Sequence, residues 1–340
     1  MKKSIIFTLS LVLSVATFAQ QLATLNHNGN TTAYYGMNAL QQAHAAAVNG
    51  DIITLSSGIF NSVDITKAVT IRGAGAWVDT NGNSNTILYN NFTLNVPADT
   101  SHHLLLEGIY FMNTVQYSSV HNPQFNKCHF TSLSYGNTTS GSMQDAVATN
   151  CIIETWSNYG GSDAGWSAQG TQFYNCVLLN SGNYGPDNFV NCIVNQHPQT
   201  AWITSRLFQN CILYSSAGYS TYCNGNGSTS FNCMYVFTGG NISQNLYSDT
   251  PNHVLWNKSG MLTVFKTFDG TYSSTTTFEL QDSIAANYLG TDGTQIGIYG
   301  GLHPFSPKVT SPVIKSINVA QRNNSEGKLE VNIEMVTEDE

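Results

Sequence analysis

The chain has 340 residues, of which only 9% are charged, where about 25% is usual for a soluble domain. The formal net charge is −8 and the sequence contains no basic cluster, so nucleic acid and anionic membrane surfaces are poor candidate partners. With so few charges, the surface must be built mainly from Asn, Ser, Thr, Gly and Tyr.

Residues 1–19 have the pattern of a signal peptide. Two lysines precede an apolar run over residues 5–18, and small residues lead to a predicted cleavage near Ala19. We therefore expect a secreted protein, located in the periplasm, at the cell surface or outside the cell. No later run reaches the roughly 18 apolar residues of a membrane helix, so no membrane span is predicted.

Residues 37–48 are rich in alanine, and their apolar positions recur near helical spacing before a stop at Asn49-Gly50. This pattern predicts one short amphipathic helix, and residues 21–33 before it are expected to form an extended lead-in. Strands are predicted next, over residues 51–55 and 69–71. We expect the helix to cover the open end of the body that these strands begin.

A short phrase recurs between residues 125 and 233, usually a phenylalanine three residues before a cysteine and an asparagine directly before it. Successive copies are 23, 25, 16, 19 and 22 residues apart, and an apolar run follows each. Units of this length become stable only by stacking on their neighbours. The repeat predicts an all-β solenoid, a parallel β-helix of roughly 11 to 13 coils. Phenylalanine and cysteine would form interior columns, and asparagine would form a column at a bend. The cysteines of the phrase are Cys128, Cys151, Cys176, Cys192, Cys211 and Cys233.

Seven cysteines in an exported chain would ordinarily suggest disulfides. Six of them occupy one repeat position beside apolar residues, as small buried hydrophobic side chains do. We therefore predict free buried thiols at these six positions. Cys223 lies outside the phrase, and its redox state stays open.

The opening of the body resembles a known family. The alanine-rich helix is followed by the segments 50–55, 58–60, 65–71 and 73–75, and this order resembles the first coils of right-handed parallel β-helix proteins of the pectin-lyase-like superfamily. The resemblance implies a right-handed parallel β-helix over residues 20–303. It does not select an activity, because the superfamily includes lyases, hydrolases, epimerases, phage tailspikes and adhesins.

Further strands are predicted over residues 253–256 and 262–265, and residues 292–301 resemble the closing coil of exported bacterial β-helix proteins. Residues 304–340 should form a separate end. Alternating apolar and polar residues over 313–319 and 328–334 predict a β-hairpin that covers the far end of the solenoid or begins a further module. The last residues form an acidic tail.

Catalytic signatures of the family are missing. Its lyases pair Ca²⁺-binding carboxylates with a basic residue, and its hydrolases carry clustered aspartates. The best available candidates are Asp163, Asp187 and Arg206, whose spacings of 24 and 19 residues could place them on one face. Solvated loop charges with one structural ion pair are the simpler interpretation. No histidine pattern has metal-ligand spacing, so no metal or cofactor is predicted.

Aromatic residues offer a second candidate site. Tyrosine stands eight residues after three of the repeat cysteines, and tryptophans occur in the same turn regions. Flat rings flanked by amides and hydroxyls suit the apolar faces of sugars, although a structural packing ladder explains the same pattern. The candidate ligand-binding residues are Tyr159, Tyr184, Tyr219, Trp156, Trp166 and Trp202.

Two functional hypotheses follow. The first is a secreted protein that binds a polysaccharide or cell-surface glycan, or mediates surface interaction, without catalysis. It rests on the uncharged, amide-rich and tyrosine-rich surface. The alternative is a polysaccharide lyase or glycoside hydrolase that acts on a plant or host glycan, and it rests on the family resemblance.

Overall fold

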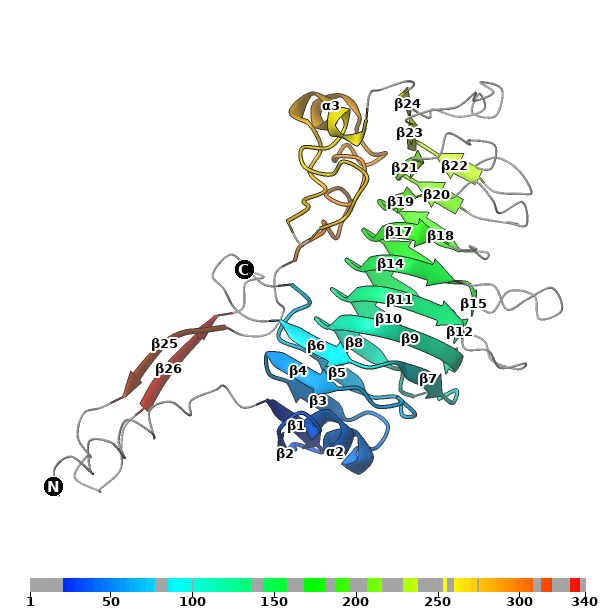
Figure 1. Ribbon diagram of the computed structural model, residues 1–340. Helices are drawn as coiled ribbons and strands as arrows, with labels where there is room; N and C mark the ends of the chain where they lie inside the picture. The colour runs from blue at the N-terminus through cyan, green and yellow to red at the C-terminus, as the bar shows by residue number, and fades with distance from the viewer. Residues whose placement is uncertain are drawn as a thin grey trace, which may run out of the picture.

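The computed structural model describes residues 21–77, 85–99, 101–135, 143–157, 168–181, 187–195, 207–215, 229–237, 253–255, 260–273, 275–307, 313–319 and 331–336. The predicted signal peptide lies outside these residues. Among them, no helix is both long and apolar enough to cross a membrane. β-Strands are the main secondary structure of the described chain, and those of the body stack along one direction, with the N-terminal elements at one end (Figure 1).

The described strands of the body form two large sheets, here named sheet A and sheet B. Sheet A contains, in spatial order, β2 (Asn30–Tyr35), β1 (Leu22–His27), β3 (Ile52–Leu55), β5 (Thr70–Arg72), β8 (Leu105–Glu107), β10 (Gln124–Asn126), β13 (Val147–Thr149), β16 (Gln172–Tyr174), β18 (Asn188–Val190), β20 (Leu207–Gln209) and β22 (Thr229–Phe231). The order of sheet B is β15 (Ala168–Gln169), β12 (Met143–Gln144), β9 (Tyr110–His121), β11 (His129–Tyr135), β14 (Ile152–Ser157), β17 (Val177–Ser181), β19 (Ile193–Asn195), β21 (Ile212–Ser215), β23 (Met234–Phe237) and β24 (His253–Leu255). Three further strands join sheet B near β9, namely β4 (Gly58–Asn61), β6 (Thr86–Tyr89) and β7 (Phe92–Val96).

From β3 onward the chain passes repeatedly between the two sheets, in places with two successive strands in sheet B, and strands pair in parallel with the equivalent strands of neighbouring repeats. For example, β16 of sheet A is followed by β17 of sheet B, and then β18 pairs with β16. One strand from each sheet, with the bend between them, is called a coil below. This topology is compatible with the predicted parallel β-helix.

The repeated phrase forms the passage from sheet A to sheet B. Its phenylalanine faces the interior, and the rings of Phe173, Phe189 and Phe208 stack with centroids 4.9 and 4.8 Å apart, which is the spacing between neighbouring strands. The cysteine that follows the bend is buried and free in all six copies. The predicted columns of phenylalanine and cysteine, and the free thiols, are confirmed for these residues, whereas Cys223 lies outside the described ones.

The residue before each cysteine, which is asparagine in five of the six copies, makes the bend itself. It adopts the left-handed conformation, which asparagine tolerates better than most residues because its short polar side chain can bond locally. This confirms the predicted asparagine column, which is called the bend column below. Its members, with their φ angles, are Lys127 (49°), Asn150 (54°), Asn175 (51°), Asn191 (53°), Asn210 (54°) and Asn232 (51°).

The N-terminal end is closed by a hairpin and a helix. Helix α2 (Ala39–Ala46) is confirmed within the predicted range, and it buries Ala39, Leu40 and Ala43 against the first strands. The extended lead-in predicted over residues 21–33 is wrong, because β1 and β2 form an antiparallel hairpin there and β1 pairs with β3. Polar, exposed positions in β2 hid this hairpin from sequence patterns.

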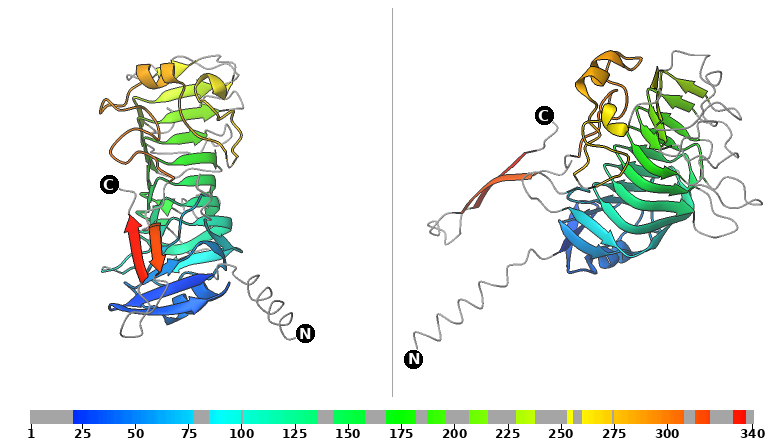
Figure 2. Two further views of the ribbon diagram at one scale, coloured as in Figure 1. Left: turned by 90° about the vertical axis from the view of Figure 1, so that its left-hand side faces the viewer. Right: turned by 45° about the horizontal axis from the view of Figure 1, so that its top comes forward.

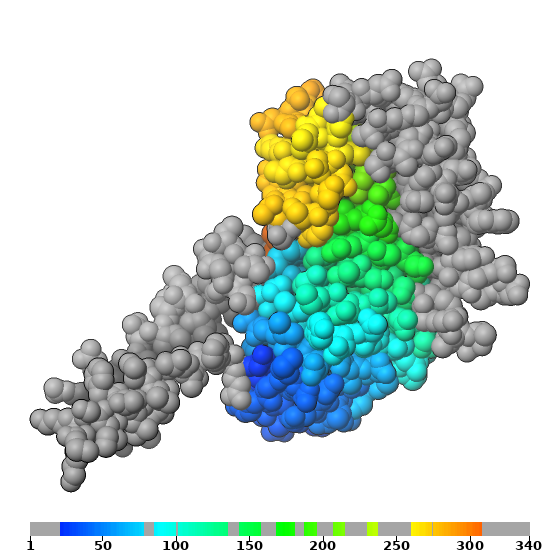
Figure 3. All heavy atoms as spheres, viewed as in Figure 1, coloured from blue at the N-terminus to red at the C-terminus, as the bar shows by residue number. Residues whose placement is uncertain are grey.

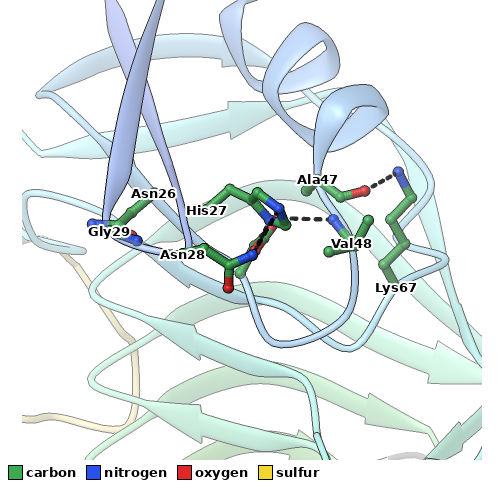
Figure 4. A network of polar contacts seen from close by, with 8 residues as sticks. Asn26, His27, Asn28, Gly29, Ala47, Val48 and Lys67 are labelled. Atoms are coloured by element: carbon green, nitrogen blue, oxygen red, sulfur yellow. Dashed lines mark hydrogen bonds and ion pairs between the residues drawn. The ribbon is translucent and has the colours of Figure 1, made fainter.

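Partly buried polar contacts hold the C-terminal end of the helix and this hairpin in place (Figure 4). Asp51, which lies just before β3, accepts a hydrogen bond from the backbone of Val48 at 2.8 Å and lies 2.8 Å from Nδ1 of His27 in β1. Lys67 donates to the carbonyls of His44 and Ala47 at 2.6 and 2.7 Å. A cation at this position satisfies carbonyls that the end of a helix leaves unpaired.

Residues 260–307, called the C-terminal segment below, lie along the outer face of sheet B (Figures 1 and 3). The segment contains the 3₁₀ helix η2 (Met261–Thr263) and helix α3 (Asp282–Asn287). Strand β24 fits the strand predicted over residues 253–256, but the strand predicted over 262–265 is wrong because η2 occupies that stretch. Residues 292–301 form turns beside the bend column instead of a closing coil.

Two apolar cores result. The first lies between the sheets and contains the phenylalanine and cysteine columns. The second joins outward-facing residues of sheet B, among them Val177, Ile193 and Ile212, to residues of the C-terminal segment such as Phe265 and Ile298. Sheet B is therefore buried on both faces over its central strands.

Strands β25 (Val313–Val319) and β26 (Val331–Val336) pair in an antiparallel hairpin, which confirms the hairpin predicted for this end of the chain. The hairpin stands away from the two sheets (Figure 2). It does not cover the far end of the body in this arrangement.

Candidate binding groove

The outer face of sheet A carries a groove beside the C-terminal segment. Two adjoining hollows of about 530 and 600 Å³ form it, and Val147, Thr149 and His303 line both. Because these residues are shared, the hollows make one elongated depression, called the sheet-A groove below. It extends over β10, β13, β16, β18 and β20.

The floor of the groove comes from the last residue of each of these strands. The middle residue of each strand points into the core, so its neighbours face outward. Parallel pairing brings the last residues side by side. Over five strands the column is about 19 Å long at about 4.8 Å a step. The column consists of the uncharged residues Asn126, Thr149, Tyr174, Val190 and Gln209.

The C-terminal segment supplies one wall, and the bend column holds it in place. Asn175 donates from Nδ2 to the carbonyls of Ile298 and Gly300 at 2.8 and 2.7 Å. The backbone N–H of Thr291 donates to Oδ1 of Asn210 at 3.1 Å, and Asn232 donates to the carbonyl of Leu289 at 2.9 Å. The asparagines that turn the chain therefore also position the wall of the groove.

Close packing at Gly301 shows how tightly the wall fits. Its φ is +76°, and a Cβ placed there would lie 1.9 Å from Nδ2 of Asn191. A larger residue would push the wall off the bend column. Nearby, hydrogen bonds from Thr294 lower the pKa of Asp292, so this wall carboxylate stays ionised at neutral pH.

The β10 end of the groove differs from the rest. Lys127 replaces asparagine in the bend column, and the hollow there is also lined by Asn150, His303 and Ser306. On the neighbouring strands Arg72 pairs with Glu107, with Nε and Oε2 3.0 Å apart. Asn126 donates to the other carboxylate oxygen of Glu107 at 2.9 Å. The charges of the described groove therefore gather at its ends, away from the uncharged floor.

The residues predicted from sequence have mixed outcomes. Trp156 is wrong as a ligand platform: it has no exposed surface and packs in the core against Tyr117 and Phe173, with ring centroids 5.9 and 5.4 Å away. Asp187 is also fully buried, just before β18, so its carboxylate does not face the groove solvent. The other candidates lie outside the described residues and stay predictions, namely Asp163, Arg206, Tyr159, Tyr184, Tyr219, Trp166 and Trp202.

His129 lies on sheet B under the C-terminal segment, where it has a structural role in packing. Its ring stacks on Tyr110 at 4.5 Å and meets the edge of Tyr272 at 5.5 Å, and Nε2 lies 2.7 Å from Glu154. Burial raises the pKa of Tyr272 to about 12. Within the described ranges, no three or more His, Cys, Asp or Glu residues gather as a metal site would require.

Sequence patterns did not single out the groove residues. The signal that could have found them is the variable position between the phenylalanine and the asparagine of the phrase, which faces outward in every described sheet-A strand of the groove. Comparison of the chain with protein-family models, with curated proteins and with solved structures gives no match.

Proposed function

We propose that the protein is an exported right-handed parallel β-helix, similar to the pectin-lyase-like proteins, and that it binds a polysaccharide in the sheet-A groove without catalysis. The observation that carries this proposal is the uncharged column of side chains along the groove floor, which crosses five strands. Its length of about 19 Å, at about 4.8 Å a step, suits several linked sugar rings.

The chemistry of the floor supports a glycan. Asn126, Thr149 and Gln209 offer amides and a hydroxyl that can both donate and accept hydrogen bonds, as sugar hydroxyls require. Tyr174 and Val190 offer apolar surface for the C–H faces of a sugar ring. Because the strands repeat like groups at nearly constant spacing, the floor is suited to a polymer more than to a compact ligand.

The alternative is a polysaccharide lyase or glycoside hydrolase. One observation favours it, which is that Glu107, Arg72 and Lys127 place one carboxylate and two cations around the β10 end of the groove. A glycoside hydrolase generally needs a second carboxylate across the scissile bond. Glu107 lies beside the groove without lining it, and Asp292, the carboxylate that does line the described groove, belongs to the opposite hollow. The binding function is therefore the better supported of the two.

Affinity electrophoresis in gels that contain neutral polysaccharides tests the binding function. We expect retention of the wild-type protein by at least one of mannan, xyloglucan and laminarin. Tyr174→Ala should weaken that retention about tenfold, since stacking and burial of an aromatic ring contribute on the order of 1 kcal/mol or more. Tyr89→Ala is the matched control, because Tyr89 is exposed on sheet B. Equal retention of both variants would contradict the groove as the binding site.

An activity assay distinguishes the enzymatic alternative from binding without catalysis. Release of reducing ends, or of unsaturated uronate products seen by absorbance, would be measured on the same polysaccharides and on polygalacturonate. Non-catalytic binding predicts no turnover. Robust turnover that Glu107→Gln abolishes would replace the binding function with the enzymatic one.

A further inference from the structure

Sheet A ends in an open edge at its N-terminal end. Strand β2 is the outermost strand there, and among the described strands it pairs only with β1 (Figure 1). Helix α2 contacts both strands and closes the core beside them, but it forms no strand pair with β2. The backbone of β2 is therefore the last rung of the sheet on this side.

The pairing of β2 with β1 shows which backbone groups point out from this edge. The N–H of Gly36 donates to the carbonyl of Gln21 at 2.8 Å, and in an antiparallel pair every second residue makes such bonds. Counted back along the register, the even-numbered residues of β2 bond to β1. The N–H and C=O groups of Thr31, Ala33 and Tyr35 therefore point away from the sheet.

The sequence of this end does not protect the edge. Exposed edge strands usually carry charges, proline or a bulge, which prevent pairing with another chain. Residues 20–50 contain no Lys, Arg, Asp, Glu or Pro, and the register of β1 with β2 is regular. Tyr35 and Met37, at the end of the edge, are 57% and 47% exposed. The edge is a surface to which a further strand can be added.

We propose that this further strand is β2 of a second copy of the chain, paired antiparallel about a twofold axis. A symmetric contact brings the same surface of both copies together, so a charge on the edge would face its own copy. The lack of charged residues over 20–50 removes this repulsion. It also leaves no group on the edge that would select a charged peptide, which favours a second copy as the occupant.

Backbone geometry fixes the register of the dimer. Hydrogen-bonded pairs must form between the outward-facing residues of the two strands. The register that uses all of these groups places Ala33 opposite Ala33 of the second copy, on the axis, and Thr31 opposite Tyr35. Each of these pairs exchanges two N–H···O bonds. No outward-facing backbone group of β2 is then left unpaired.

The dimer would join the two copies of sheet A into one continuous sheet. The twofold axis of an antiparallel strand pair is perpendicular to the sheet, so the outer faces of both copies lie on the same side. The sheet-A grooves of the two copies then face the same side, and one dimer could hold a polymer at two points. This last consequence depends on the proposed polysaccharide binding, whereas the dimer itself does not.

Substitutions of Ala33 test the position of the axis. Ala33 is exposed in the single chain, so a larger side chain fits there without a clash. Ala33→Lys and Ala33→Glu each place two like charges opposite one another, and each should convert the wild-type dimer into a monomer. An equal mixture of the two variants should restore a dimer, because Lys then faces Glu. Met112→Lys is the matched control, because it adds the same charge at a 43% exposed strand position in sheet B.

Size-exclusion chromatography with light scattering measures the mass of the chain without its predicted signal peptide over a range of protein concentrations. The wild type and Met112→Lys should shift from the mass of one chain to that of two as the concentration rises. Each Ala33 variant should stay at the mass of one chain. Native mass spectrometry of the mixture should detect a dimer that contains one copy of each variant.

Three outcomes overturn the proposal. A wild type that stays monomeric at every concentration would show that the β2 edge does not take a second copy. Dimerisation of Ala33→Lys alone would place the interface elsewhere. A mixture that stays monomeric, while far-ultraviolet circular dichroism shows both variants folded, would show that Ala33 does not lie on the axis. None of these measurements uses a glycan, so failure of the dimer is distinguishable from failure of the proposed function.

Discussion

At the scale of single residues, the bend asparagine has two roles that are usually separate. Its backbone takes the left-handed conformation that turns the chain from sheet A to sheet B, and its side chain holds a segment that is distant in sequence. Asn175 and Ile298, for instance, are 123 residues apart yet joined by a 2.8 Å hydrogen bond. Glycine could supply the first role but not the second.

Substitution of Asn175 separates these roles. Asn175→Gly should keep the bend and lose the hydrogen bonds to Ile298 and Gly300. We expect the free energy of unfolding to fall by about 1–3 kcal/mol, measured by urea denaturation. Asn122→Gly, with a similar bend and an exposed side chain, should change it little. Equal effects of the two substitutions would show that the amide contacts do not hold the wall.

His44 gives the protein a predictable response to acid. Burial first, and the charge of Lys67 second, lower its pKa from 6.5 to about 4, and its Nε2 accepts a hydrogen bond from the backbone of Thr66. Above pH 6.5 neither state binds the proton. Between about pH 6.5 and pH 4 mainly the unfolded chain binds the proton. The free energy of unfolding should therefore decrease, as the pH is lowered through this interval, by up to about 1.4 kcal/mol per pH unit.

Urea denaturation at pH 7, 5.5 and 4.5 measures this response. His44→Gln should flatten the decline over that interval, whereas His103→Gln, at an exposed position, should leave the slope as in the wild type. A slope unchanged by His44→Gln would mean that this side chain is not buried in the neutral form.

At the scale of elements, the interior columns explain why the repeat could be recognised from sequence. Similar residues must face inward at one position of every coil. The periodic cysteine and phenylalanine residues of the sequence therefore predict that the coils stack. The six described thiols are buried and free, and a thiol buried in the core is out of reach of reagents in solution.

The thiols of the cysteine column should therefore not react with thiol reagents in the native protein. In a Cys223→Ser variant, the thiol reagent DTNB should label no cysteine under native conditions and six in guanidinium chloride. Phe189→Ala in the same background should speed labelling, because removing a ring stacked between Phe173 and Phe208 loosens the core beside the thiols. Rapid labelling of the unaltered column in native buffer would contradict its burial.

Other elements could not be predicted for physical reasons. The β1–β2 hairpin consists mostly of polar residues, and its pairing with β3 decides its conformation. The C-terminal segment has apolar residues at irregular spacing, and its path is set by sheet B, which is distant in sequence. Trp156 was misassigned because sequence spacing places a residue near a turn but does not say which side of the chain it faces.

At the scale of the whole molecule, the C-terminal segment makes sheet B an internal layer. Residues such as Val177, Ile193, Ile212 and Met234 face outward from the sheet and still have no exposed surface. A chain that ends at Ser259 would expose this column to water. Contiguous apolar surface of this kind promotes association.

We therefore expect the chain ending at Ser259 to aggregate or to bind the dye ANS strongly, as judged by size-exclusion chromatography and fluorescence. The control is a chain that ends at Pro307, which retains the segment and lacks the β25–β26 hairpin. It should remain soluble and dye-negative. A soluble, dye-negative chain ending at Ser259 would show that the segment is not needed to cover sheet B.

The contacts between the bend column and the C-terminal segment also limit how this architecture can change length. Stacked repeats are generally free to gain or lose a unit, since each touches only its neighbours. Here the C-terminal segment runs alongside several coils and is hydrogen-bonded to Asn175, Asn210 and Asn232. Adding or deleting one coil between these asparagines would shift their hydrogen-bonding positions by a whole strand spacing, while the C-terminal segment kept its length. The length of the segment therefore restricts the number of coils that this architecture can contain.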